Sequence, residues 1–227
     1  MSEYNGCILI PAYNEVDHIA DVINKAKMFL PVIVVDDGST DETASFSTNA
    51  GAVVYKQIPN QGKGAALQRG FHEAVQSGFD FIITMDADGQ HDPEEIPLFL
   101  KRFNETRADL IIGYRDFSKM PLVRKLANSS GGFAFSWAMG QTIRDNQSGY
   151  RLMSKRLLQN VLSSEETGFE FEVEVIVNCI LAGYTLEWVP IKTIYADELS
   201  HIKPIPHLIN FIRIVLQTRK RMRSKKI

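Results

Sequence analysis

The sequence contains little cysteine and no long apolar run. Its 227 residues include two cysteines, and Cys7 lies in an apolar segment, so we expect free, buried thiols in a reducing compartment. No apolar run reaches the ~18–20 residues of a membrane span, and residues 1–5 lack the positive start and apolar core of a signal peptide. We therefore expect a cytoplasmic protein that can associate peripherally with the inner face of the membrane.

The chain also lacks a strong net charge, internal repeats and low-complexity segments other than its tail. The formal net charge is −2, which provides no general attraction for nucleic acid, so we expect no nucleic-acid partner. Acidic residues are concentrated before position 200, whereas the tail is basic, which suggests an arm with a local partner. The basic residues of the tail are Arg219, Lys220, Arg221, Arg223, Lys225 and Lys226.

Short apolar runs that predict strands alternate with segments of helical periodicity. Strands are expected at 6–11, 32–35, 52–55, 79–85 and 110–113, with helices at 16–30, 41–50, 63–76 and 94–103. The less regular second half predicts helices at 122–139, 171–182 and 208–222 and strands at 150–153 and 185–189. This alternation indicates an α/β fold with a mostly parallel central sheet flanked by helices and right-handed crossovers.

A chain of this length and apolar content fits one globular domain, or a domain with a short appendage. We expect the domain at 1–206, with a nucleotide-binding half at 1–115 and an acceptor half at 116–206. Residues 207–227 form a C-terminal amphipathic helix and basic tail. Two interpretations of that helix stay open: an ordinary packing helix, or a surface helix that meets anionic headgroups or a membrane protein.

The most informative motif is a pair of carboxylates, Asp86 and Asp88, that directly follows the apolar run 81–85. The carboxyl end of a strand is where ligands bind in α/β sheets. Mg²⁺ commonly binds one or two carboxylates together with phosphate oxygens of a substrate. The pair therefore points to phosphate or diphosphate chemistry.

Polar loops follow the first four expected strands, at 12–15, 36–41, 60–64 and 86–90. In a parallel sheet these loops emerge on one edge, where carboxylates suit a base and ribose. Lys63 opens a helix beside glycines and suits a phosphate, although an ordinary surface lysine remains an alternative. It is not a P-loop lysine, because the surrounding motif is missing.

Three motifs resemble those of glycosyltransferase family 2, whose members are nucleotide-sugar transferases of the GT-A fold. They are Pro-Ala-Tyr-Asn-Glu at 11–15, Val-Asp-Asp-Gly-Ser-Thr-Asp at 35–41 and Met-Asp-Ala-Asp-Gly-Gln at 85–90. The motifs at 60–64, 113–115 and 145–151 resemble the dolichol- and polyprenyl-phosphate mannose or glucose synthase branch. The resemblance extends through most of the chain.

The resemblance implies a role for each matching residue. The nucleoside of a UDP- or GDP-sugar would be bound by Pro11, Ala12, Tyr13, Glu15 and Asp37. The diphosphate would be held through Mg²⁺ or Mn²⁺ by Asp86 and by the catalytic Asp88. Gln90 would lie near the donor sugar, and the acceptor phosphate or leaving diphosphate would meet Arg115 and Arg151. Enzymes of this branch invert the anomeric carbon.

The acceptor determines whether a general base is needed. A phosphate acceptor is ionised at neutral pH and needs no strong base, whereas a hydroxyl needs one, for which Asp145 and Glu172 are the candidates. Glu172 and Glu174 lie two positions apart on an expected helix, so at most one faces the site. The lone His91 is expected to be a packed or surface residue rather than a ligand.

We therefore predict a metal-dependent inverting glycosyltransferase that moves a hexose from a nucleotide-diphospho-sugar to a polyprenyl (dolichyl or undecaprenyl) phosphate. The alternative within the family is transfer to a saccharide hydroxyl in cell-surface polysaccharide synthesis. Two other classes fit less well. A haloacid-dehalogenase-like phosphatase would carry its aspartate pair after the first strand, and a non-catalytic nucleotide-binding module would not turn over the sugar.

Overall fold

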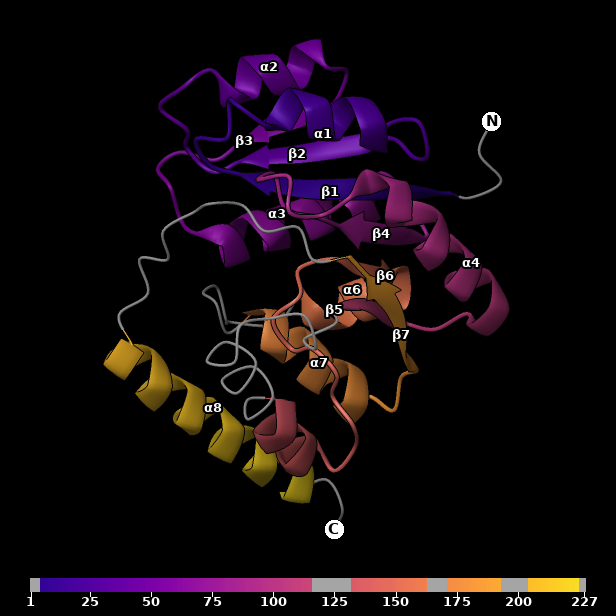
Figure 1. The fold of residues 1–227 in the computed structure, drawn as a ribbon, viewed down its shortest axis with the longest axis vertical. Coiled ribbons are helices and arrows are strands. Elements are labelled where there is room, and N and C mark those ends of the chain that lie inside the picture. The colour runs from indigo at the N-terminus through magenta and orange to yellow at the C-terminus, as the bar shows by residue number, and fades with distance from the viewer. Residues whose placement is uncertain (1–4, 116–131, 163–170, 193–203, 225–227) are drawn as a thin grey trace.

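The computed structural model describes residues 5–115, 132–162, 171–192 and 204–224 (Figure 1). These residues form a seven-stranded sheet with helices on both faces. The first half contains β1 (Gly6–Ala12), α1 (Ile19–Ala26), β2 (Val32–Asp36), α2 (Thr43–Asn49), β3 (Val53–Lys56), α3 (Lys63–Gln76), β4 (Phe81–Thr84), the 3₁₀ helix η1 (Pro93–Glu95), α4 (Ile96–Thr106) and β5 (Leu110–Arg115). The second half contains β6 (Arg151–Ser154), α6 (Lys155–Val161), α7 (Phe171–Leu181), β7 (Leu186–Ile191) and α8 (Pro204–Ser224).

The sheet has the order β3-β2-β1-β4-β6-β5-β7. Strands β1 to β4 pair in parallel, with β1 between β2 and β4. Strand β6 is antiparallel to both of its neighbours, β4 and β5, and β7 is parallel to β5. The expected mostly parallel α/β architecture is confirmed, and the carboxyl ends of β1, β2 and β4 meet at one edge.

Alternate residues of each central strand enter different cores, because side chains of a strand point to opposite faces. In β1, Cys7 and Leu9 join the core under α3, α6 and α7, whereas Ile8 and Ile10 join the core under α1 and α4. Burial on both faces explains why these strands are almost continuously apolar. The result is the three-layer arrangement of Figure 1.

Helix α3 crosses β1 at very short range, and Gly70 makes this approach possible. A Cβ at position 70 would lie 2.3 Å from Cδ1 of Leu9. With any larger residue, either the buried Leu9 side chain or α3 would have to shift. Because α3 begins at Lys63, this contact also determines where that lysine stands relative to the carboxyl edge.

The sequence located most elements but not all their bounds. Helix α1 is shorter than predicted, and the predicted helix at 94–103 is the 3₁₀ helix η1 followed by α4. Helix α6 was not predicted at all. The first part of the predicted helix at 122–139 lies outside the described residues, and residues 132–139 are helical. Both cysteines are free and buried, as predicted, and burial raises the pKa of each thiol to about 12.

The last helix, α8, packs against the body of the protein. Val215 is buried, and the Phe211 ring meets the Phe135 ring edge-on at a centroid distance of 5.3 Å. The predicted boundary between residues 206 and 207 falls inside this helix, and the division into domains stays a prediction. Within the described ranges, no helix has the length and apolar character needed to cross a membrane.

Candidate active site

A cleft of about 370 Å³ opens at the carboxyl edge of β1, β2 and β4. The structure brings residues from all four predicted loops together there. The cleft is lined by Pro11, Ala12, Tyr13, Glu15, Asp37, Asn60, Gly62, Lys63, Ala66, Asp86, Ala87 and Asp88. Of the residues predicted to bind the donor, Gln90 alone is not part of this lining.

The first two loops of the cleft are tied to each other by side-chain hydrogen bonds. Asn14 has a left-handed backbone (φ 56°), and its Oδ1 accepts from the Thr40 amide at 2.8 Å. The Asn14 amide donates to Ser39 Oγ at 2.9 Å, and the Glu15 amide donates to Thr43 Oγ1 at 2.8 Å. The Tyr13–Glu15 turn is therefore held in place before any ligand arrives.

Asp37 holds the third loop. Its Oδ1 accepts from Gln57 Nε2 at 2.8 Å and from the Gln61 amide at 2.9 Å, while Oδ2 accepts from the Gly62 amide at 2.8 Å. The side chain lies at the wall of the cleft, but its oxygens bind the loop that leads into α3. Asp37 thereby positions Lys63, and direct contact with a nucleoside stays a prediction.

The Asp86–Asp88 loop is held by hydrogen bonds between backbone amides and side chains of the same loop. The Asp86 amide donates to Nδ1 of His91 at 2.9 Å, and Oδ1 of Asp88 accepts from the Gln90 amide at 2.9 Å. The His91 ring is buried and stacks on Tyr150 at 4.9 Å. Burial lowers the pKa of His91 against the opposing effect of Asp86, which agrees with an unprotonated Nδ1. His91 is a packed residue that fixes the turn.

Lys63 stands between two carboxylates. Its Nζ lies 2.6 Å from Oδ1 of Asp86 and 3.0 Å from Oε1 of Glu172. Burial raises the pKa of Asp86, but the positive charge of Lys63, its hydrogen bond and the more distant charge of Arg151 outweigh burial and lower it to about 2. Burial likewise opposes the charged form of Lys63, and the two carboxylates outweigh it and raise the pKa of Lys63.

Glu172 and Glu174 point in different directions, as their spacing predicted. Glu172 faces the cleft through Lys63, whereas Glu174 pairs with Arg221 of α8 at 2.7 Å. Only Glu172 of the two is therefore near the candidate site.

Gly149 brings the motif at 145–151 against the aspartate loop. A Cβ at this position would lie 3.0 and 3.2 Å from the two carboxylate oxygens of Asp86 and 3.3 Å from Nζ of Lys63. The Gly149 carbonyl accepts from Thr84 Oγ1 at 2.7 Å. Only glycine fits here without crowding the Lys63–Asp86 pair, a role that sequence reasoning missed although Gly149 is part of a recognised motif.

Asp145 and Arg115 form a two-pronged ion pair. Nε of Arg115 lies 2.8 Å from Oδ2 of Asp145, and Nη2 lies 3.1 Å from Oδ1. The same carboxylate accepts from the amides of Gln147 and Ser148, both at 3.1 Å. Asp145 is buried with its oxygens occupied by these donors, so the structure does not favour it as a general base. Arg115 is partly exposed, and its two hydrogen bonds to Asp145 fix the orientation of its guanidinium.

Arg151, which the family resemblance made a candidate to contact the acceptor phosphate or the leaving diphosphate, is buried at the start of β6. Its guanidinium donates to the carbonyl oxygens of Ser148 at 2.7 Å and Asn146 at 3.1 Å, and to that of Glu172. The residue is 2% exposed. This environment does not favour the predicted contact with a phosphate, and instead makes Arg151 a residue that positions the 145–151 segment and the start of α7.

The acidic pair fits a hard divalent cation that is completed by substrate oxygens. Asp86 and Asp88 offer carboxylate oxygens at the cleft wall, and the Lys63 ammonium already places a positive charge 2.6 Å from Asp86. The described residues contain no group of three or more His, Cys, Asp or Glu side chains that could hold a metal alone. Mg²⁺ and Mn²⁺ tolerate such a site when phosphate oxygens complete the shell.

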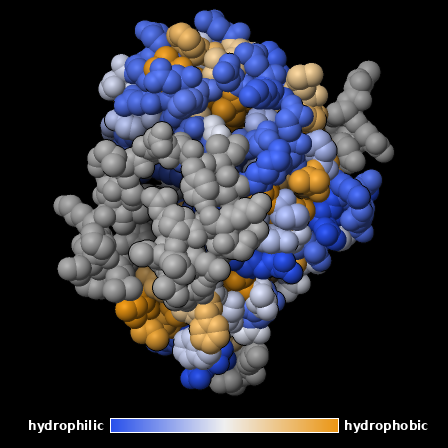
Figure 2. All heavy atoms as spheres, in the orientation of Figure 1, coloured by the Kyte–Doolittle hydropathy of each residue, from blue (hydrophilic) through white to orange (hydrophobic). Residues whose placement is uncertain are grey.

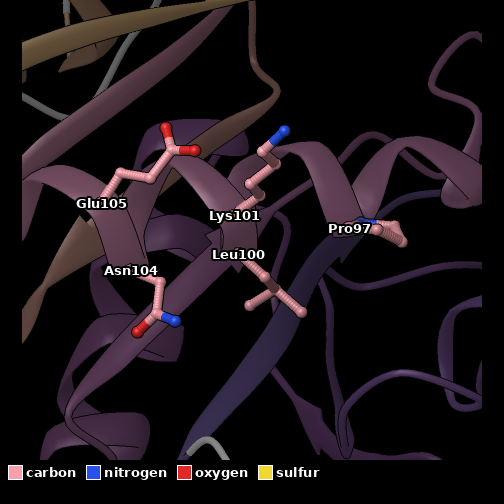
Figure 3. Close-up of a pocket in the computed structure, with 5 residues that line it drawn as sticks. All are labelled: Pro97, Leu100, Lys101, Asn104 and Glu105. Atoms are coloured by element: carbon pink, nitrogen blue, oxygen red, sulfur yellow. The ribbon is translucent and has the colours of Figure 1, made fainter.

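A second hollow, of about 470 Å³, lies along the outside of α4 (Figure 3). Its lining comes from one helix only and consists of Pro97, Leu100, Lys101, Asn104 and Glu105. Figure 3 shows these side chains spread along the helix rather than converging on one point. The hollow contains neither aspartate of the acidic pair, and we do not regard it as the active site.

Comparison with known proteins agrees with this geometry. Residues 7–162 match the model of the family described as Glycosyl transferase family 2. A UDP-N-acetylglucosamine–dolichyl-phosphate N-acetylglucosaminyltransferase of Methanococcus voltae is 31% identical, over 84% of this chain and 86% of that protein. An undecaprenyl-phosphate mannosyltransferase of Micrococcus luteus is 30% identical, over 86% of this chain and 85% of that protein.

Solved structures show the same architecture. Glucosyl-3-phosphoglycerate synthase from Mycobacterium tuberculosis, in complex with Mn²⁺, UDP and phosphoglyceric acid, superposes with a TM-score of 0.71 at 21% identity. The match covers 97% of this chain and 79% of that one. The fold is therefore GT-A. The chain belongs to glycosyltransferase family 2 and is an enzyme, a glycosyltransferase.

Proposed function

We propose that this enzyme is a metal-dependent, inverting glycosyltransferase that moves a hexose from a nucleotide-diphospho-sugar to a polyprenyl phosphate. One observation carries the proposal: Asp86, Asp88 and Lys63 line the same cleft as the loop 11–15. A nucleotide-sugar requires an acidic pair that binds a cation, an ammonium that binds a phosphate, and a neighbouring surface that binds the nucleoside. Relatives named for transfer to dolichyl or undecaprenyl phosphate support the acceptor.

The nucleoside would bind along Pro11, Ala12, Tyr13, Glu15 and the wall around Asp37. Tyr13 is 47% exposed at this wall, so its ring is available to stack on a base. Its backbone turn is fixed by the Asn14 hydrogen bonds, which reduces the entropy lost when the donor binds.

The diphosphate would bind where the acidic pair meets the start of α3. Asp86 and Asp88 would hold Mg²⁺ or Mn²⁺, which when bound neutralises charge that develops on the leaving diphosphate. Helix α3 begins at Lys63, so its first amides and the ammonium both favour negative charge nearby. Lys63 would leave Asp86 for the diphosphate while staying close to Glu172. Gln90 and Asp88 would then face the donor sugar.

A phosphate acceptor is consistent with the contacts of the two candidate general bases, because both carboxylates are already bound by other groups. Asp145 is bound by Arg115 and two amides, and Glu172 is paired with Lys63. A hydroxyl acceptor would need one of them as a base, whereas an ionised phosphate oxygen needs none. This favours polyprenyl phosphate over a saccharide hydroxyl. The phosphate oxygen would attack the anomeric carbon opposite the diphosphate, which leaves with the bonding electrons, and Arg115 would steady the acceptor phosphate.

The test is a transfer assay with a panel of UDP- and GDP-hexoses, each with a short-chain, water-soluble prenyl phosphate or an oligosaccharide as acceptor. We expect sugar on the prenyl phosphate with an inverted anomeric configuration by NMR, loss of transfer with EDTA, and recovery with Mg²⁺ or Mn²⁺. Transfer only to the saccharide, or transfer that EDTA does not affect, would overturn the proposal.

A further inference from the structure

Two pairs of large apolar side chains are exposed on neighbouring helices. Phe133 and Trp137, in the helical segment 132–139, are 78% and 49% exposed, and Ile212 and Leu216 of α8 are 49% and 57% exposed. Each pair is spaced four residues apart, so its members lie on one face of their helix. Exposed apolar residues that occur singly are normal, but grouped ones mark an interaction surface.

The two pairs belong to one surface because their helices are packed together. Nη1 of Arg219 donates to the Trp137 carbonyl at 3.0 Å, and its guanidinium lies over the Trp137 ring at 4.9 Å. Arg219 lies one turn beyond Leu216 on the same side of α8, so Leu216 belongs to the part of α8 that is nearest this contact. We call Phe133, Trp137, Ile212 and Leu216 the apolar surface. Figure 2 shows apolar side chains gathered in this part of the molecule, at the lower left, where Figure 1 places α8.

Basic residues flank the apolar surface on α8. The sequence from Leu199 onward contains no aspartate or glutamate. Lys220 and Arg223 continue the line of Ile212 and Leu216 along the helix, and both are exposed. Apolar and aromatic groups beside a row of cations are what an anionic bilayer surface binds. A second copy of the chain fits less well, because the same stretch of α8 on a second copy carries no acidic residue to pair with these cations.

We propose that the apolar surface and its basic flank dock the enzyme on a bilayer with anionic headgroups. The purpose of this contact rests on the proposed function, because a polyprenyl phosphate is embedded in a bilayer. The geometry suits that purpose. In Figure 1, α8 begins on the side of the molecule toward which β1 and β2 point, the side on which the cleft opens.

The test measures co-sedimentation of the whole chain with vesicles that contain no polyprenyl phosphate and no donor. One set is phosphatidylcholine alone, and the other contains an equal amount of phosphatidylglycerol. We expect binding to the anionic set only, weakened by high salt. Lys220→Gln with Arg223→Gln lowers the partition coefficient about 30-fold, and Phe133→Gln with Leu216→Gln lowers it at least about tenfold. The control Met28→Gln, at a residue 80% exposed between α1 and β2, leaves it unchanged.

Two further measurements separate this proposal from its alternatives. Transfer to the water-soluble prenyl phosphate needs no bilayer, so the four substitutions leave it unchanged, and its absence counts against the proposed function alone. The docking proposal is overturned if the wild-type chain does not sediment with anionic vesicles, or if the variants sediment like wild type. It is also overturned if Phe133→Gln abolishes a dimer seen by analytical ultracentrifugation, because the surface is then a contact between copies.

Discussion

Replacing Lys63 by methionine moves two binding equilibria in opposite directions. The substitution keeps the length of the side chain and removes the ammonium that lies 2.6 Å from Asp86 and 3.0 Å from Glu172. In the ligand-free enzyme this ammonium competes with a metal ion for Asp86. In the donor complex of the proposed function, the same ammonium would contact the diphosphate.

The expected change in Mn²⁺ affinity follows from the exposure of the Lys63–Asp86 pair, and the expected change in nucleotide-sugar affinity follows from the hydrogen bond that is lost. The Lys63 side chain is 40% exposed, so breaking its pair with Asp86 costs about 1 kcal/mol. Without that cost, Lys63→Met binds Mn²⁺ about fivefold more tightly in the absence of nucleotide. A hydrogen bond from an ammonium to a phosphate contributes about 2 kcal/mol. Its loss weakens binding of the nucleotide-sugar to the Mn²⁺-saturated variant about 30-fold.

Two titrations test whether the affinity for Mn²⁺ rises while the affinity for the nucleotide-sugar falls. Electron paramagnetic resonance of free Mn²⁺ gives the affinity of the apoenzyme for metal, and isothermal calorimetry at saturating Mn²⁺ gives the affinity for the nucleotide-sugar. Lys101→Met is the matched control, because Lys101 lies on the outside of α4 beside the second hollow (Figure 3). If Mn²⁺ binds Lys63→Met no more tightly than it binds wild type, the ammonium does not compete with the metal and the reasoning fails.

Three other substitutions probe separate parts of the site. Asp88→Asn lowers kcat/KM for transfer at least about 100-fold without changing the far-ultraviolet circular dichroism spectrum; near-wild-type turnover would remove Asp88 from the mechanism. Arg151→Met leaves buried carbonyls without a donor and lowers the free energy of unfolding in urea by about 3 kcal/mol. The control Arg102→Met, at a partly exposed arginine of α4, changes it by less than about 0.5 kcal/mol, and equal effects would contradict a buried positioning role. The folded pKa of Asp86, about 2, lies below its ordinary 3.8, so its ionised form stabilises the fold fully above pH 4 and loses this effect as the pH falls through 2. The difference in unfolding free energy between wild type and Asp86→Asn therefore shrinks across that interval, and a difference independent of pH would show that the Lys63–Asp86 pair does not stabilise the fold.

The sequence predicts the sheet best at the central strands, whose two faces are both buried. Strands β1, β2 and β4 are apolar runs closed by polar residues, and their parallel pairing forces the following loops to one edge. That is why Asp86 and Lys63, far apart in the sequence, were expected together. The two glutamates of α7 were separated correctly by helical spacing alone.

A strand was predicted at 150–153, where the structure has β6, but its antiparallel pairing could not be read from the sequence, and the short helix α6 was missed. Strand β6 has four residues, and its partners β4 and β5 are identified only by long-range pairing such as Phe81 with Ser154. Helix α6 has seven residues and begins at a Ser154 cap, where Oγ accepts from the Leu157 amide. Helix α6 is too short to show a clear helical period.

The contacts of the long cationic side chains could not be predicted from the sequence either. A motif gives the position of Arg151 but not which of its surroundings accepts its hydrogen bonds, and the structure directs them to carbonyls. Likewise, the contact of Lys63 with Glu172 joins α3 to α7 across more than a hundred residues. Packing of the whole chain decides such contacts, and local pattern does not.

Because β6 lies beside β5 in the sheet, the long segment between these two strands begins and ends at neighbouring points. The chain leaves the sheet at Arg115 and returns at Arg151 on adjacent strands, where the Gly113 amide donates to the Tyr150 carbonyl at 2.9 Å. The Arg115–Asp145 pair clasps the two ends a short distance beyond. A segment that leaves and rejoins the sheet on neighbouring strands can vary without shifting the strands that carry the acidic pair, provided that it keeps the apolar side chains that enter the core at Phe135, Ala138, Met139 and Ile143. Chimaeras that graft residues 116–144 from a relative should therefore keep the donor while acquiring the relative's choice of acceptor.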